Sequence, residues 1–329
     1  MQIYAVFIPQ KYGIMDELER QLAAFVRDSP LQRLDDPFPD PVPIHLYMKR
    51  DDRLHPLVSG NKWRKLKYNL LDARRQNLDT LVTFGGAFSN HLYATAAAGQ
   101  VFGFRTIGIV RGEEYPQRDT STLAFCRRAG MRLYGISRSA YRDVTSSGTA
   151  SEQTDFVTRV TGMPAGFYVL PEGGTNALAV RGVAELLPDI QMQLGRTPDF
   201  VCCPVGTGGT VAGLASSASS STTVVGFSAL KGGSFLRDEV ERLLGYAPQN
   251  LRIQTEYHGG GYARTTPELL AFMRVFEQKT GIRIEQVYTG KMLFGLYDLA
   301  RTGYFPAGSV VVAVHTGGLQ GRSSLLDTP

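Results

Sequence analysis

The sequence contains few cysteines and no pattern typical of a metal site. Its three cysteines are Cys126, Cys202 and Cys203, and an odd number with two adjacent does not suggest a disulfide framework. The adjacent pair lies in the apolar stretch DFVCCPVG, and no partner pair with ligand spacing occurs. A buried strand explains these cysteines better than metal ligation does. The sequence therefore predicts neither disulfides nor a metal centre.

Long hydrophobic runs and dense basic clusters are also missing. No apolar run reaches membrane-spanning length, and the N-terminal stretch MQIYAVFIPQ lacks the pattern of a signal peptide. The net charge is +5, from 35 Lys and Arg against 30 Asp and Glu, and the basic residues are scattered. We therefore expect a cytoplasmic protein with neither a membrane nor a nucleic acid as partner.

Lysine is scarce as well, because most of the basic charge is carried by arginine. The chain has only eight lysines, and three of them, Lys62, Lys65 and Lys67, lie in the stretch SGNKWRKLKY. A lysine can lose its proton and become an amine nucleophile, whereas an arginine cannot. This cluster therefore indicates a place where amine chemistry could occur.

The remaining sequence alternates short apolar segments with helical ones. Strands are expected at 45–52, 80–86, 105–112, 131–137, 166–174, 199–206, 223–229 and 309–318. Helices are expected at 13–29, 61–76, 89–103, 119–129, 176–194, 208–218, 234–245, 267–279 and 291–302, and the proline-rich residues 30–44 are expected to form an extended connector. Continuously apolar strands that alternate with helices predict an α/β fold with parallel sheets covered on both faces.

Three of the expected strands end in glycine clusters, FGG, PEGG and PVGTGG. Ligands of open α/β sheets bind at the carboxyl ends of the strands. The stretch PVGTGGTVAGL lies between a strand and a helix, where backbone N–H groups can hold an anion. It matches neither a P-loop nor a dinucleotide-binding motif. Phosphate binding and an ordinary tight turn both remain open for it.

Two other motifs support no familiar chemistry by themselves. FGGAFSNH, residues 84–91, lacks the spacing of a serine-hydrolase elbow, and the single His315 at a strand end is more often structural than a ligand. Taken together, a lysine cluster, an anion loop and polar strand ends suggest a phosphate-bearing aldehyde held by a lysine. That combination indicates pyridoxal phosphate as the cofactor.

Six motifs then carry a resemblance to a known family. SGNKWRKL, FGGAFSNH, PEGGTNAL, GTGGTVAG, VYTGK and HTGG occur in this order, and the chain resembles the family of D-cysteine desulfhydrases and 1-aminocyclopropane-1-carboxylate (ACC) deaminases over residues 44–110 and 165–325. The resemblance implies a fold type II enzyme with two open, twisted, mainly parallel sheets flanked by helices. It implies a large domain of residues 1–65 and 163–329, a small inserted domain of residues 66–162, the cofactor between them, and a homodimer.

The resemblance also implies roles for individual residues. Lys62 matches the Schiff-base lysine, and Lys65, on the same helix face, matches a lysine that contacts the phosphate. The phosphate loop corresponds to Gly206, Thr207, Gly208, Gly209 and Thr210. Asn90 matches the residue that binds the 3'-oxygen of the cofactor. Ser89, Asn90 and His91 match the substrate carboxylate side, Tyr262 and Tyr288 match two active-site tyrosines, and Thr289 and Thr316 lie where the pyridine nitrogen is bound.

Ser89 has a second interpretation, because Ser89 or Asn90 could be the N-cap of the helix that follows. We favour a substrate contact for Ser89, since Asn90 or the preceding glycines could supply the cap.

Thr289 bears on the substrate. ACC deaminases resemble one another in having a glutamate at this position and a leucine at the position of Thr316, whereas desulfhydrases have a threonine hydroxyl facing the nitrogen. A carboxylate keeps that nitrogen protonated, and a hydroxyl leaves it neutral, which favours loss of a β-leaving group. The expected function is α,β-elimination on a small β-substituted amino acid, first of all D-cysteine. ACC deamination, or cofactor binding without turnover, are the alternatives.

Overall fold

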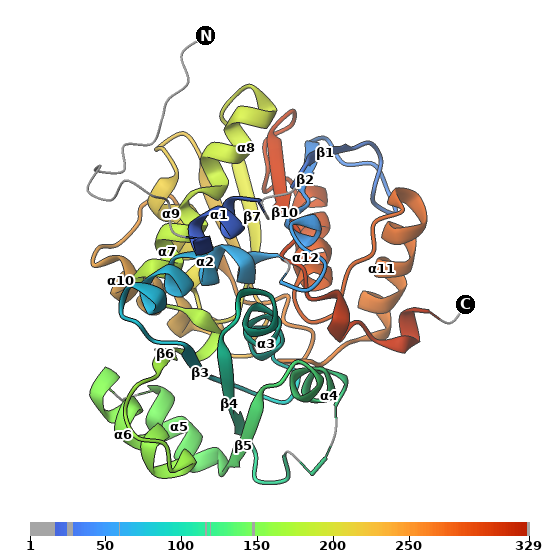
Figure 1. Ribbon diagram of the computed structural model, residues 1–329. Coiled ribbons are helices and arrows are strands. Elements are labelled where there is room, and N and C mark those ends of the chain that lie inside the picture. Colours follow the sequence, from blue (N-terminus) through green and yellow to red (C-terminus); the bar gives the residue numbers. More distant parts are fainter. Residues whose placement is uncertain are drawn as a thin grey trace, which may run out of the picture.

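The computed structural model describes residues 17–24, 29–58, 60–115, 117–118, 120–146 and 149–327. The described chain forms two β-sheets, and each sheet is flanked by helices (Figure 1). One sheet has six strands in the order β1-β2-β10-β7-β8-β9, and the other has four in the order β5-β4-β3-β6. Only β1 and β2 pair antiparallel. The expected α/β architecture with two mainly parallel sheets is confirmed.

The strands of the six-stranded sheet are β1 Leu31–Leu34, β2 His45–Lys49, β7 Phe200–Val205, β8 Thr223–Ser228, β9 Leu251–Gln254 and β10 Val310–Val314. Those of the four-stranded sheet are β3 Thr80–Gly85, β4 Arg105–Arg111, β5 Arg132–Ile136 and β6 Tyr168–Leu170. The helices are α1 Glu17–Ala24, α2 Asn61–Arg75, α3 Asn90–Phe102, α4 Ser121–Arg128, α5 Arg138–Ser146, α6 Ala150–Thr161, α7 Ala177–Ala184, α8 Leu186–Leu194, α9 Gly209–Ser217, α10 Leu236–Leu244, α11 Pro267–Thr280 and α12 Thr289–Arg301.

Alternate side chains of the six-stranded sheet enter two separate cores. Val311 and Ala313 of β10 pack with α11 and α12, whereas Val312 and Val314 pack with α7, α8, α9 and α10. Successive residues of a strand point to opposite faces, so a strand covered on both faces is apolar throughout. This explains the unbroken apolar run of residues 310–314.

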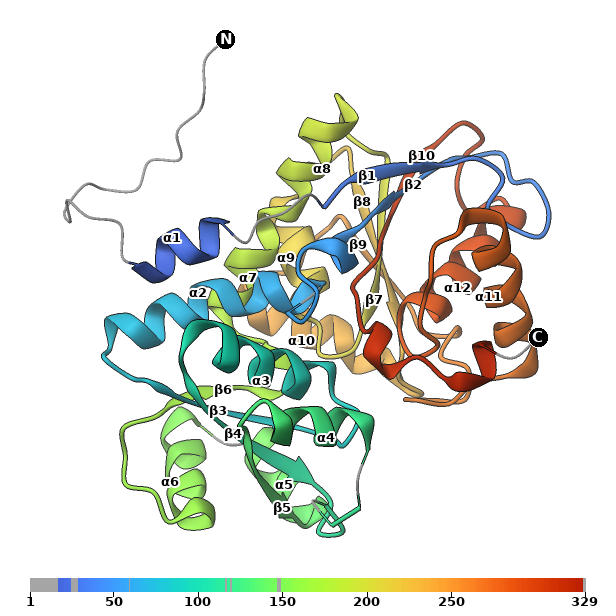
Figure 2. The same ribbon diagram turned by 45° about the vertical axis from the view of Figure 1, so that its right-hand side comes forward.

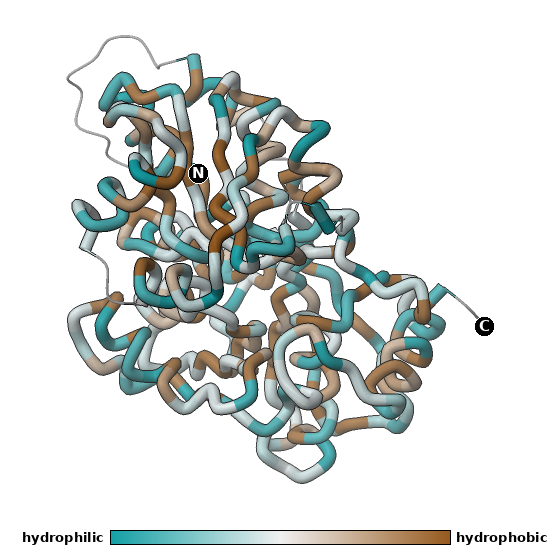
Figure 3. The backbone as a smooth tube through the Cα atoms, turned by 90° about the horizontal axis from the view of Figure 1, so that it is seen from below, coloured by the Kyte–Doolittle hydropathy of each residue, from teal (hydrophilic) through white to brown (hydrophobic). Residues whose placement is uncertain are grey.

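The four-stranded sheet is covered in the same way (Figure 2). Leu81 of β3 packs with α2 and α3, while Val82 and Phe84 pack with α5 and α6. Hydrophilic residues occupy many of the outer turns, as Figure 3 shows. The two sheets meet where α2 runs between them, and the residues of the candidate site lie along this boundary.

Several local expectations differ from the structure. The helix expected at 176–194 is divided into α7 and α8 at Glu185, because Pro188 has no N–H to continue the hydrogen-bond ladder. Strand β1 lies in the expected connector, and α5, α6 and β9 follow no pattern that we had identified. Of the helix expected at 13–29, residues 17–24 are observed as α1, residues 13–16 and 25–28 lie outside the described residues, and Ser29 is not helical.

The domain boundary at residue 162 stays a prediction. Strand β6 pairs with β3 in the four-stranded sheet. On this pairing we propose that the smaller unit runs to Leu170 rather than ending at 162.

A buried ion-pair network secures the start of α2. Asp51 accepts hydrogen bonds from the Arg64 side chain at 2.6 and 2.9 Å and from the Ser29 hydroxyl at 2.5 Å. Arg64 also contacts Asp189 of α8, which pairs with the buried Lys49 at 2.8 Å. Removing one partner of a buried pair leaves an uncompensated charge, so this network ties α2 to the six-stranded sheet.

Asp51→Ala should therefore lower the free energy of unfolding by about 3–5 kcal/mol, the usual cost of breaking a buried pair. Urea denaturation would measure it. The control is Asp79→Ala, because Asp79 pairs with Arg105 on the surface and such pairs contribute little. Equal shifts of the urea midpoint in the two variants would contradict the role of Asp51.

Candidate active site

Lys62 and Lys65 lie on one face of α2, as their spacing predicted. Their Nζ atoms donate to the same backbone oxygen, that of Gly173, at 3.2 and 3.1 Å. Lys65 is 2% exposed and also donates to the Thr175 hydroxyl at 2.9 Å. Lys67 is partly exposed and pairs with Glu185 at 2.8 Å.

Burial changes the charge state of both amines. It lowers the pKa of Lys62 to about 8, against the opposing effect of the Glu172 carboxylate. Burial, followed by the charge of Lys62, lowers the pKa of Lys65 well below its ordinary value. An amine must be unprotonated to act as a nucleophile. The neutral form of Lys62 is therefore accessible close to neutral pH.

The glycine-rich loop between β7 and α9 faces Lys65. Gly208 precedes α9 with a φ of 80°, in the left-handed region that favours glycine. A Cβ at Gly209 would lie 3.0 Å from Lys65 Nζ and 2.9 Å from the Thr175 side chain. The Thr175 and Thr207 hydroxyls are 2.6 Å apart. The helix N-terminus, the lysine and the hydroxyls together form a cradle suited to a phosphate group.

The other residues of this loop contact both sides of the site. The Thr210 hydroxyl accepts a hydrogen bond from the Asn61 side chain at 2.8 Å, which fixes the loop against the start of α2. A Cβ at Gly206 would lie 3.2 Å from the Tyr288 ring. Only a residue without a side chain fits there unless the ring moves.

The start of α3 provides three predicted residues. The Ser89 hydroxyl accepts the backbone N–H groups of His91 and Leu92, both at 3.2 Å, so Ser89 is the N-cap of α3. Asn90, the alternative candidate for the cap, is the first residue of the helix, and its side-chain oxygen accepts from Gln320 at 2.8 Å.

His91 is buried, and neither of its ring nitrogens has a hydrogen-bond partner within the described chain. Burial and the nearby Lys62 and Lys65 lower its pKa well below the ordinary value. The imidazole is therefore neutral at physiological pH and has one donor and one acceptor available.

Two tyrosines close another side of the site. The rings of Tyr262 and Tyr288 meet edge to face, with centroids 6.0 Å apart. Burial raises the pKa of both hydroxyls, and for Tyr288 the neighbouring Tyr262 adds to the effect. Both hydroxyls stay protonated at neutral pH and can donate hydrogen bonds.

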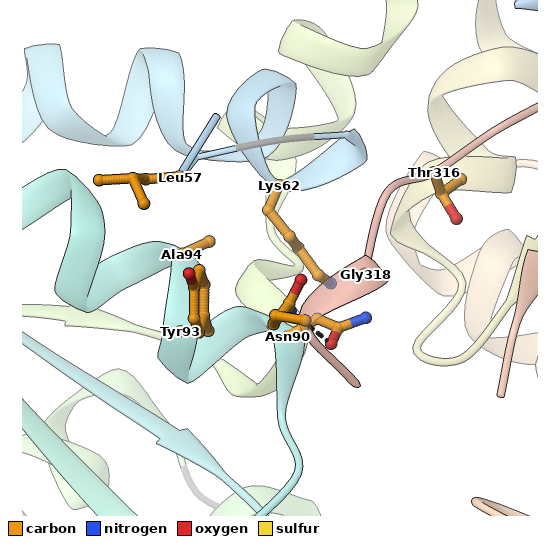
Figure 4. A pocket seen from close by; sticks show the side chains of 8 residues that line it. Leu57, Lys62, Asn90, Tyr93, Ala94, Thr316 and Gly318 are labelled. Atoms are coloured by element: carbon orange, nitrogen blue, oxygen red, sulfur yellow. Dashed lines mark hydrogen bonds between the residues drawn. The ribbon is translucent and has the colours of Figure 1, made fainter. Parts of the chain in front are cut away.

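Thr289 is the first residue of α12, whereas Thr316 follows strand β10. Thr289 is fully buried, and within the described residues its hydroxyl has no partner. Thr316 lines a small cavity together with Lys62, Asn90, Gly318 and Gln320 (Figure 4). In that view Lys62 extends toward Asn90 and Gly318.

Two acidic residues were missed by the sequence analysis. Glu285 is buried and accepts the N–H groups of Val287, Tyr288 and Thr289 at 2.6 to 3.1 Å, so it caps the start of α12. Burial raises its pKa to about 7 despite these bonds. An acidic residue just before a predicted helix was the available signal.

Glu172 is the second of these residues. It lies between a proline and two glycines at the end of β6, and its carboxylate acts on the pKa of Lys62. A carboxylate inside a glycine cluster at a strand end could have been recognised as part of a ligand site.

The expectation of a structural His315 agrees with its contacts. Its Nδ1 accepts the Gly317 N–H at 3.2 Å, and its Nε2 lies 2.8 Å from the Arg283 carbonyl oxygen. The described ranges contain no cluster of three or more His, Cys, Asp or Glu residues able to hold a metal ion. No helix among them is both long and apolar enough to cross a membrane.

These observations fit pyridoxal phosphate. The cofactor needs an amine for its aldehyde, a cradle for its phosphate and a partner for its ring nitrogen. Lys62, the cradle around Gly209 and the unpaired Thr289 hydroxyl supply groups of these three kinds.

Comparisons with known proteins agree. The family described as pyridoxal-phosphate dependent enzyme matches residues 22–317. The chain is 31% identical to the mitochondrial bifunctional D-cysteine desulfhydrase/1-aminocyclopropane-1-carboxylate deaminase of Arabidopsis thaliana, over 87% of this chain and 78% of that protein. It is 29% identical to the D-cysteine desulfhydrase of Serratia proteamaculans, over 92% and 96%.

A solved structure of an ACC deaminase homologue superposes with a TM-score of 0.72 at 27% identity, covering 94% of this chain and 96% of that one. The chain therefore belongs to the pyridoxal-phosphate dependent enzymes, and within them to the fold type II group that includes the D-cysteine desulfhydrases and ACC deaminases.

Proposed function

We propose that this enzyme catalyses α,β-elimination on a small β-substituted amino acid, with D-cysteine as the favoured substrate and pyruvate, ammonia and sulfide as products. The observation that carries the proposal is the buried, unpaired hydroxyl of Thr289. A hydroxyl does not hold a proton on a pyridine nitrogen as a carboxylate does. Glu285, the nearest carboxylate in the sequence, is engaged by three backbone N–H groups.

Different residues of the site bind the cofactor and transfer the α-proton. When bound, the cofactor supplies an aldehyde for the substrate amine and a ring that withdraws electrons from Cα. Lys65 and residues 206–210 would hold its phosphate, and Asn90 would bind its 3'-oxygen. Thr316 lines the same small cavity as Lys62 and Asn90. Lys62, with its pKa of about 8, takes the α-proton as a general base.

The substrate is oriented by the remaining residues. Ser89, Asn90 and His91 receive its carboxylate at the start of α3, where backbone N–H groups favour an anion. Tyr262 and Tyr288 stay protonated, and their hydroxyls donate hydrogen bonds to the leaving sulfur. These roles account for loss of a thiol from the β-carbon.

A direct assay tests the proposal. Purified protein loaded with pyridoxal phosphate should release sulfide and pyruvate from cysteine, faster from the D than from the L enantiomer. Release of 2-oxobutyrate from ACC at a higher kcat/KM would favour the deaminase alternative, and release from no substrate would favour a binding protein without turnover.

We further propose a homodimer that acts in the cytoplasm. The support is the resemblance of the six motifs to enzymes that form homodimers. Sedimentation of the purified protein at twice the mass of 36.1 kDa would agree with the dimer, and a single-chain mass would contradict it.

The first variant concerns the two amines on α2. Lys62→Ala should lower kcat by several orders of magnitude, since it removes both the covalent anchor and the base, yet the protein should keep bound cofactor through the cradle. Lys65→Ala should instead weaken cofactor binding, as equilibrium dialysis would show. Lys67→Ala is the control from the same helix. Activity of Lys62→Ala near the wild-type level would contradict this assignment.

The second variant tests both roles of Ser89. Ser89→Ala removes the N-cap of α3 and should cost about 1 kcal/mol of stability. A lost substrate contact should also lower kcat/KM at least tenfold, or about 1.4 kcal/mol. Thr266→Ala is the control, because Thr266 caps α11 through the Leu269 N–H at 3.3 Å. A similar kcat/KM in the two variants would show that Ser89 serves only as the N-cap of α3 and does not contact the substrate.

The third variant tests Thr289. In the cofactor-free protein Thr289→Val should leave stability unchanged or raise it, because it removes an unpaired buried hydroxyl, while affinity for pyridoxal phosphate should fall. Thr222→Val is the control, since the buried Thr222 hydroxyl donates to the Pro198 carbonyl at 2.8 Å. Removing this hydroxyl should lower the stability of the protein. Thermal melting and fluorescence titration would measure the two effects. Unchanged affinity in Thr289→Val would contradict the proposed contact.

A further inference from the structure

The ends of three neighbouring strands bring together charges that the elimination of cysteine does not use. In the four-stranded sheet β3 lies between β4 and β6. Arg111 is the last residue of β4, and Glu172 follows the end of β6. Between them β3 ends in Gly85 and is followed by Gly86, and neither glycine places a side chain in the gap. Neighbouring strands are about 4.8 Å apart, so the backbones of β4 and β6 are about 10 Å apart.

Arg111 reaches across the end of β3. A Cβ at Gly86 would lie 3.4 Å from its guanidinium, and its Cζ is 5.7 Å from the centroid of the Tyr141 ring. None of the ion pairs found in the described part of the chain involves Arg111. The Tyr141 ring therefore holds the charge of Arg111 near the strand ends.

Glu172 approaches the same region from the other side. The next residue, Gly173, accepts the hydrogen bond of Lys62 at 3.2 Å, which places Glu172 beside the reacting amine. After burial, the Glu172 carboxylate is the main influence that raises the pKa of Tyr141, whereas Arg111 lowers it. Arg111 and Glu172 oppose each other at Tyr262 as well. Two opposite charges therefore face the same pair of tyrosines.

Tyr141 provides an independent sign of a ligand. It is 2% exposed, and its ring packs edge-on against Phe84 of β3. Its hydroxyl faces the Glu172 carboxylate, but within the described residues it has no hydrogen bond of normal geometry. Buried polar groups almost always have a partner, so an unpaired phenol beside two charges indicates that a polar ligand completes it.

We propose that Arg111, Glu172 and Tyr141 bind a second amino-acid head group, so that the substrate class is an alanine joined through sulfur to another α-amino acid. This inference rests on the proposed elimination and specifies its leaving group. The distal carboxylate pairs with Arg111, the distal ammonium pairs with Glu172, and the Tyr141 hydroxyl binds between them. The sulfur then lies toward Tyr262, between the two head groups. A free thiol such as that of cysteine would leave all three side chains unused.

Lanthionine, two alanines joined by one sulfur, illustrates the chemistry. Lys62 takes the α-proton, the Cβ–S bond breaks with its electron pair on sulfur, and the sulfur takes up a proton to give cysteine. The remaining three-carbon enamine is hydrolysed by water to pyruvate and ammonia. Lanthionine and water thus give cysteine, pyruvate and ammonia, with no oxidant or reductant required.

The test compares lanthionine with S-propylcysteine, which has the same thioether but no second head group. For each protein, the kcat/KM for lanthionine is divided by the kcat/KM for S-propylcysteine. Glu172→Gln and Arg111→Gln should each lower this ratio by about tenfold or more, which corresponds to about 1.4 kcal/mol. Arg105→Gln, at the opposite end of β4, is the control and should leave the ratio as in the wild type. A ratio that changes less than about twofold in both test variants would overturn the inference.

A binding measurement separates this inference from the proposed function. Calorimetric titration of lanthionine into Lys62→Ala protein should give a Kd that rises about tenfold when Glu172→Gln is added, whether or not the wild type turns over. Equal Kd values would overturn the head-group site. Elimination from cysteine or S-propylcysteine but not from lanthionine would also overturn it while the proposed function stands. Loss of elimination from every compound, with the Kd difference retained, would refute the function alone.

Discussion

The close approach of Gly60 to Thr316 is the constraint on which the site depends. Gly60 has a φ of 67°, and a Cβ there would lie 1.9 Å from the Thr316 carbonyl oxygen. The neighbouring Asn61 N–H donates to the same oxygen at 3.3 Å. This contact joins the end of β10 in one sheet to the start of α2, and Asp51 holds the same helix through Arg64. These two contacts fix the start of α2 relative to the six-stranded sheet, and they thereby fix the position of Lys62 at the boundary between the two sheets.

Desolvation sets the chemistry of that boundary. The same burial lowers the pKa of Lys62 to about 8, depresses that of His91 and raises that of Glu285 to about 7. Each shift favours the neutral form, because a charge in a low-dielectric environment loses its hydration. Desolvation also penalises the phosphate of an anionic cofactor. The Lys65 amine and the backbone N–H groups at the start of α9 are the donors that would replace its hydration.

Much of the fold followed from local pattern, and the failures have local causes. The strands of the parallel sheets were recognisable because apolar runs such as residues 310–314 are covered on both faces. The helix at 176–194 was extended through Pro188 although a proline interrupts the ladder. Strand β9 escaped notice because an edge strand of four residues with a half-exposed pattern carries a weak signal. Glu172 and Glu285 were overlooked because a single carboxylate has no periodicity.

By itself the sequence determined the class of fold and the cofactor, and it predicted the residues around that cofactor, because order and spacing along the chain specify a strand-glycine-helix plan and a lysine face on α2. The tertiary structure alone decided which of these residues meet, since Lys65, Thr175 and Gly209 come from separate elements and touch only after folding. It also decided that Ser89 caps α3, that Thr289 has an unpaired hydroxyl, and that Arg111 and Glu172 face one pair of tyrosines. Burial and long-range contact depend on the whole packed chain, and no local pattern encodes them.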